Sequence, residues 1–73
     1  MSDEFLKALY KMSGGEYKII ERYKVGREIG IPNTQVDDIV DDLDNMGLVK
    51  KIGETKILMT FEGKLEAESS KPS

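Results

Sequence analysis

The chain of 73 residues has no cysteine and no histidine, and each absence excludes a class of chemistry. Without cysteine there is no disulfide, no thiolate metal site and no cysteine nucleophile. Without histidine, the commonest general base and the commonest zinc ligand are missing as well. No apolar run approaches the roughly 18 residues that a membrane-spanning helix needs, and the N-terminus lacks the basic-then-apolar pattern of a secretion signal. We therefore expect a cytoplasmic protein with no membrane partner.

Motifs for catalysis are also missing. The glycines of Gly14-Gly15 and Gly26-x-x-x-Gly30 are not followed by the lysine and hydroxyl residue of a phosphate-binding loop. The serines have no histidine to activate them, and the paired carboxylates are neighbours on an exposed helix, where nothing predicts the desolvation of a catalytic acid. We expect no enzymatic activity, no cofactor and no small-molecule substrate.

Apolar periodicity and glycine positions divide the chain into seven elements. The sequence predicts helices over residues 3–12, 21–29, 34–46 and 61–68, a short strand over residues 17–20, and two further strands over residues 48–52 and 55–59. Thr60 is expected to cap the last helix. One domain should therefore cover residues 1–68, and residues 69–73 are expected to form a disordered tail.

The third helix is the most clearly patterned element. Its apolar residues fall on one stripe, expected to face the core: Val36, Ile39, Val40, Leu43 and Met46. Either Asn33 or Thr34 is expected to cap the helix, and Gly47 to end it.

Gly53-Glu54 separates the last two strands. Two loop residues with glycine first are typical of a type II′ hairpin, and this register would set Lys51 directly opposite Lys56. Like charges that face each other across a strand pair are destabilising. The pair therefore indicates a hairpin tip that attracts anions, although lysines also protect edge strands from aggregation.

Four stretches carry a resemblance to a known family. They are Val25-Gly26-Arg27-Glu28-Ile29-Gly30-Ile31, then Val36, Ile39-Val40 and Leu43, then Gly47-Leu48-Val49, and finally Leu58-Met59-Thr60-Phe61-Glu62-Gly63. Over residues 25–63 the chain resembles the winged helix-turn-helix regulators of transcription, of the MarR type and related bacterial and archaeal proteins. The resemblance implies an α+β fold with a three-helix core, a small antiparallel β-hairpin wing and a short C-terminal helix. It also implies DNA binding through the third helix, although core and turn positions specify a fold better than a function.

The outer face of the third helix departs from that family pattern. Residues 34–46 carry five aspartates and no basic residue, whereas residues 47–59 have a net charge of +2. The outward face centres on Thr34, Asp38, Asp41 and Asn45, and Asp42 at its flank completes the set of five candidate partner contacts. DNA phosphates repel carboxylates, so we expect this face to dock a basic protein surface; a merely solvated face is the alternative. No metal is expected, because residues 42–47 match a calcium loop poorly.

The basic residues support a second reading. Arg27, Lys50, Lys51 and Lys56 are the candidate phosphate contacts if the partner is duplex DNA, which the hairpin and the second helix would then grip. Basic residues of the second helix could instead pair with the acids of the third helix, and this pairing would leave little net electrostatic field on either helix.

Overall fold

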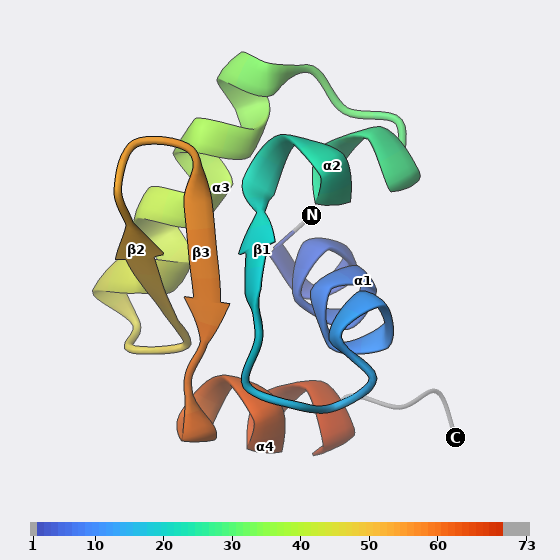
Figure 1. Ribbon diagram of the computed structural model, residues 1–73, viewed down its shortest axis with the longest axis vertical. Coiled ribbons are helices and arrows are strands. Elements are labelled where there is room, and N and C mark those ends of the chain that lie inside the picture. The colour runs from blue at the N-terminus through green and yellow to red at the C-terminus, as the bar shows by residue number, and fades with distance from the viewer. Residues whose placement is uncertain (1, 70–73) are drawn as a thin grey trace.

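The computed structural model describes residues 2–69, which form four helices and a three-stranded antiparallel sheet (Figure 1). In chain order the elements are α1 (Ser2–Ser13), β1 (Ile19–Glu21), α2 (Arg22–Glu28), α3 (Asn33–Asn45), β2 (Val49–Ile52), β3 (Lys56–Met59) and α4 (Phe61–Ser69). The predicted α+β class and the predicted order of elements are confirmed. None of the four helices combines the length and the apolar character that crossing a bilayer requires.

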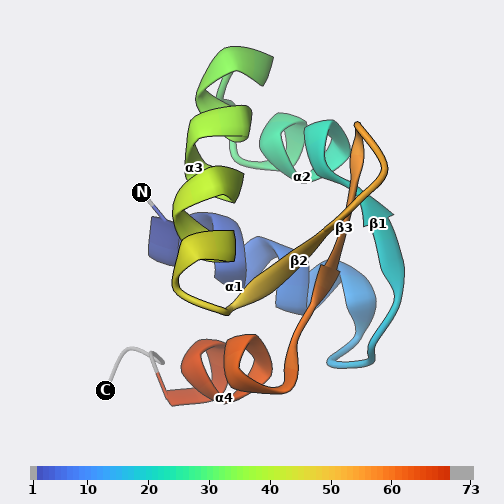
Figure 2. The same cartoon turned by 90° about the vertical axis from the view of Figure 1, so that its left-hand side faces the viewer.

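The sheet has the order β1-β3-β2, so β3 pairs with both other strands. Figure 2 shows α2 and α3 packed on one side of it. On the opposite side, Ile19, Lys50 and Lys56 are exposed. The sheet therefore has one buried face and one open face, as antiparallel sheets commonly do.

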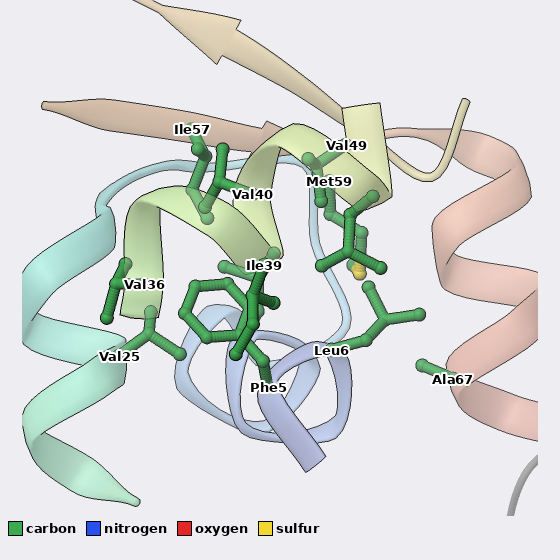
Figure 3. Close-up of a cluster of buried hydrophobic side chains, with 12 residues drawn as sticks. Phe5, Leu6, Val25, Val36, Ile39, Val40, Val49, Ile57, Met59 and Ala67 are labelled. Atoms are coloured by element: carbon green, nitrogen blue, oxygen red, sulfur yellow. The ribbon is translucent and has the colours of Figure 1, made fainter. Parts of the chain in front are cut away.

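The core is a single cluster to which every helix contributes (Figure 3). It contains Phe5, Leu6, Leu9, Val25, Val36, Ile39, Val40, Leu43, Val49, Ile57, Met59 and Ala67. Four of the five residues predicted for the core stripe of α3 are buried. The prediction for Met46 is wrong: its side chain is 57% exposed, because α3 ends at Asn45 and Met46 is already the residue that caps it.

Pro32 occupies the N-cap position of α3, so the predicted capping by Asn33 or Thr34 is wrong. Proline has no side-chain acceptor, and no side-chain capping bond is formed. The helical ladder begins instead with the Val36 N–H, which donates to the Pro32 carbonyl at 3.0 Å. Asn33 is thus the first helical residue, and Asp37 falls in the second turn, beyond the strongest part of the helix dipole.

The hairpin loop has three residues, Gly53 to Thr55, and the two-residue turn predicted from the sequence is wrong. Lys56 pairs with Ile52, and Lys51 pairs with Ile57. The Arg22 N–H donates to the Thr55 carbonyl at 2.9 Å, which continues the register between β1 and β3 by one residue. Because neighbouring strand residues point to opposite faces, Lys51 and Lys56 lie on opposite sides of the sheet.

Thr60 caps α4 as predicted. Its Oγ1 accepts the Gly63 N–H at 3.0 Å and donates to the Gly47 carbonyl at 2.7 Å. α4 extends to Ser69, one residue beyond the predicted domain end, and the Ser69 hydroxyl donates to the Glu66 carbonyl at 3.1 Å. The remainder of the predicted tail, residues 70–73, lies outside the described residues.

Candidate interaction surfaces

The outward face of α3 is exposed to solvent. Its five predicted residues are all exposed: Thr34, Asp38, Asp41, Asp42 and Asn45. They lie on the side of the helix opposite Val36, Val40 and Leu43, which face the core. The sequence therefore placed these side chains correctly, while their role in binding stays a prediction.

Asp41 has a cationic partner on the hairpin. The Lys51 Nζ lies in contact with the Asp41 Oδ1, and the two side chains are 40% and 55% exposed. The corrected register explains this pair, because Lys51 points to the side of β2 on which α3 packs. An ion pair this exposed contributes about 0–1 kcal/mol. Its main effect is electrostatic, because the pair neutralises both Asp41, an acid of α3, and Lys51, a candidate phosphate contact.

Asp37 belongs to the interface between α2 and α3. Its Oδ1 accepts a hydrogen bond from the Tyr23 hydroxyl at 2.8 Å and lies 3.6 Å from the Arg22 Nη1. The hydrogen bond to the carboxylate raises the pKa of Tyr23, and desolvation adds to this shift. The expectation that basic residues of the second helix pair with acids of the third is confirmed for Arg22 and Asp37.

Arg22 is the polar residue that the sequence predictions missed. It is only 5% exposed, and its Nη2 donates to the Lys56 carbonyl at 3.2 Å. The guanidinium thereby joins the start of α2 to the hairpin and to Asp37 of α3, although its Nε has no hydrogen-bond partner. Helical spacing held a signal for this burial, because Arg22 lies three residues before Val25 and so shares its inward face.

Three aspartates of α3 remain without a counter-charge. Asp38, Asp42 and Asp44 form no ion pair with any residue of the described part of the chain. Asp38 and Asp42 are one helical turn apart, where like charges repel by a few tenths of a kcal/mol. The acidic surface of α3 therefore retains most of its charge after folding.

The four candidate phosphate contacts are not brought together. Lys51 faces α3, whereas Lys50 and Lys56 lie on the open face of the sheet without an ion pair among residues 2–69. Arg27 pairs with Glu21, whose Oε1 lies 3.8 Å from the Arg27 Nη2. Lys50 and Lys56 thus form no ion pair inside the described chain, although Glu21 lies directly opposite Lys56 in the ladder between β1 and β3.

A shallow groove of about 600 Å³ runs between α1 and the end of α2. Its α1 wall consists of Glu4, Lys7, Ala8, Lys11 and Met12. α2 and its C-cap close the other side with Glu28 and Ile29. Over residues 2–69 no group of three or more acidic side chains is arranged to hold a metal ion.

Comparisons of the chain with protein-family models, with curated proteins and with solved structures find no match.

Proposed function

We propose that the chain is a winged helix-turn-helix domain that serves as a non-enzymatic interaction module and docks a basic protein surface on the outward face of α3. The fold assignment is supported by the short connection from α2 to α3, by the β2–β3 hairpin that follows, and by the pairing of β1 with β3. The functional assignment rests on one observation: Asp38 and Asp42 are exposed on α3 with no counter-charge within residues 2–69.

Electrostatics favours a basic protein over DNA as the partner of this face. Two like charges about 6 Å apart in water repel by roughly 0.7 kcal/mol before screening. Three unpaired aspartates set among phosphates would therefore lose a few kcal/mol. This loss approaches the roughly 4 kcal/mol by which a modest DNA-binding protein prefers its specific site. A Lys- or Arg-rich surface would replace each of these repulsions between aspartate and phosphate by an attraction.

The partner surface should carry at least two basic side chains spaced to meet Asp38 and Asp42. Arginine suits this role, because its guanidinium binds a carboxylate through two parallel hydrogen bonds. The outward face of α3 carries no apolar residue, and Met46, which caps the helix, is an exposed apolar side chain at its end. Binding should therefore be fast, weak and strongly reduced by salt.

Lys50 and Lys56 favour a second candidate function, DNA binding through the hairpin. Both are exposed and unpaired within the described chain, on the face of the sheet that no helix covers. In this alternative the open face of the hairpin contacts phosphates and α3 stays out of the groove. A DNA-binding mode of this kind depends on Lys50 and Lys56 and not on Lys51.

The two functions separate in one binding experiment with two probes. The whole chain is titrated against a fluorescent Arg-rich peptide and against random-sequence duplex DNA, at about 50 mM salt. The double change Asp38→Asn, Asp42→Asn should weaken peptide binding about tenfold, which corresponds to two charge contacts. The matched control is Glu62→Gln, Glu66→Gln, because these exposed acids of α4 have the same spacing and remove the same total charge.

The proposal predicts that the control leaves peptide binding unchanged and that the duplex is not bound. Tight binding of the duplex that is abolished by Lys50→Glu, Lys56→Glu would overturn the proposal in favour of the second candidate. Equal loss of peptide binding in both acid-neutralised variants would show that net charge, and not α3, attracts the peptide.

A further inference from the structure

We propose that the groove beside α1 is a self-association site, in which α1 of a second copy packs antiparallel about a two-fold axis near Ala8. This inference concerns a different surface from α3 and does not rest on the proposed function. It starts from the groove of about 600 Å³ that α1 forms with the end of α2.

The shape of the α1 face suits a second helix. Glu4, Ala8 and Lys11 follow helical spacing and so line up along one side of the helix. Ala8 is partly buried and has the smallest side chain of the three, so it forms a low point between two charged ends. A small residue at this point lets two helix axes approach to the roughly 8–10 Å of ordinary helix packing.

An antiparallel pair sets opposite charges together at both ends of this face, while Lys7, which also lines the groove, lies close to Lys7 of the second copy near the axis and makes the contact weaker. In an antiparallel pair centred between Lys7 and Ala8, Glu4 of one copy faces Lys11 of the other, and the two-fold axis repeats the contact. A parallel pair would set Glu4 against Glu4 and Lys11 against Lys11. Neither Glu4 nor Lys11 forms an ion pair within residues 2–69, so both charges are available to a second copy.

Apolar atoms lie at the base of the groove. Met12 and Ile29 are partly buried there, and a second α1 would cover them. The contact is nevertheless small, because a helix of 12 residues is only about 18 Å long. The buried area should fall below the roughly 1,200 Å² at which stable complexes begin. We therefore expect a weak dimer that forms at high micromolar protein concentration.

Such a dimer would leave α3 free on each copy. The core side of α3 packs on α1 (Figure 3), so the outward face of α3 points away from α1, which Figure 1 draws on the right of the molecule. Two acidic faces on one particle would bind a partner with two basic sites more tightly than one face does.

Sedimentation equilibrium of the whole chain tests the proposal, at about 50 mM salt so that exposed charges are not fully screened. The wild type should dimerise as its concentration rises. E4K and K11E should each weaken self-association about tenfold, because each replaces two attractions by two repulsions across the axis. E62K is the control, since it makes the same reversal in the first turn of α4.

Two further samples distinguish charge pairing from damage to α1. The double variant with both E4K and K11E should dimerise again, because the swap restores opposite charges across the axis. A mixture of the E4K and K11E single variants should form a mixed dimer more tightly than either variant alone. A wild type that stays monomeric at about 1 mM would overturn the proposal, as would a dimer that both single variants leave intact.

A cross-linking measurement keeps the proposal testable if the charge variants fold poorly. The chain has no cysteine, so Ala8→Cys introduces a single thiol close to the proposed axis. Under mild oxidation it should form an intermolecular disulfide faster than Lys24→Cys, which places a thiol on the exposed side of α2. Equal rates for the two variants would contradict the antiparallel pairing.

Discussion

α1 and α3 are helices of nearly equal length, with 12 and 13 residues, and both bury an apolar stripe in the same core. Their exposed faces differ in how the charge is arranged. α1 carries acids in its first turn and a lysine in its last turn, an order that suits its own dipole. α3 carries five aspartates and no cation, and its counter-charges, Arg22 and Lys51, come from other elements. A charged helix face is therefore understood only together with the elements that pack beside it.

The largest effect should come from the shared core and should be similar for both helices. Phe5→Ala in α1 and Leu43→Ala in α3 each remove a side chain that is at most 1% exposed. Phe5→Ala should lower the free energy of unfolding by about 3–5 kcal/mol, and Leu43→Ala should lower it by about 2–5 kcal/mol. Urea denaturation measures the loss. A loss of stability in only one of the two variants would show that α1 and α3 do not share a single core.

The buried contact between α2 and α3 should give the next largest effect, and it should be asymmetric. Asp37→Ala removes the carboxylate beside the buried Arg22 guanidinium, and this should lower the free energy of unfolding by about 1–3 kcal/mol. Arg22→Met removes the charge together with its unpaired Nε, so it should cost less. Urea midpoints of the two variants and of the double variant measure the difference. A larger loss for Arg22→Met would mean that the hydrogen bond to the Lys56 carbonyl matters more than the pair with Asp37.

Both helices are also joined to a neighbour by a tyrosine that donates to a carboxylate. Tyr10 of α1 donates to the Glu68 Oε2 at 2.9 Å, and Tyr23 donates to Asp37 of α3. The hydrogen bond raises the pKa of each phenol above 10.0, its ordinary value. A raised folded pKa means stability that is fully present below pH 10.0 and is lost as the pH rises through the folded value.

Thermal unfolding across the alkaline range, followed by circular dichroism, measures this loss. In the double variant Tyr10→Phe, Tyr23→Phe, the unfolding temperature should fall less steeply as the pH rises above the ordinary tyrosine pKa. Tyr17→Phe is the control, because Tyr17 is exposed. An unchanged decline in the double variant would assign the alkaline instability to other groups, such as the lysines.

The smallest effect should distinguish two adjacent lysines of β2. Lys51→Met removes the partner of Asp41 and should cost at most about 1 kcal/mol, whereas Lys50→Met removes no ion pair and should be close to neutral. Urea denaturation at low and high salt measures both changes, and salt should remove the difference between them. Equal losses at every salt concentration would show that the pair contributes nothing beyond the lysine's packing.

Features that depend on residues close in sequence were predicted well, whereas the side of the sheet on which a side chain lies was predicted poorly. The core stripe of α3 and the Thr60 cap follow from spacing within a few residues, and both are present apart from Met46. The side of the sheet on which Lys51 lies depends on whether the hairpin loop has two residues or three. A hydrogen bond from the distant Arg22 to Thr55 accompanies that choice.

The candidate site shows the same limit. Exposure of Asp38 and Asp42 was predictable from helical periodicity, because an outward face needs no knowledge of other elements. The partners of Asp37 and Asp41 were not predictable in detail, since they come from α2 and from the hairpin. Which acids stay unpaired is therefore a property of the tertiary structure.

Docking of a basic surface on α3 can be measured residue by residue, by titrating the isotope-labelled chain with the Arg-rich peptide and then with duplex DNA while the amide NMR shifts are recorded. If the outward face of α3 docks a basic surface, the peptide should shift the amides around Asp38, Asp42 and Asn45, and the duplex should leave them unchanged at the same salt concentration. Perturbation of the Asp38 and Asp42 amides by the duplex, with none by the peptide, would contradict this docking.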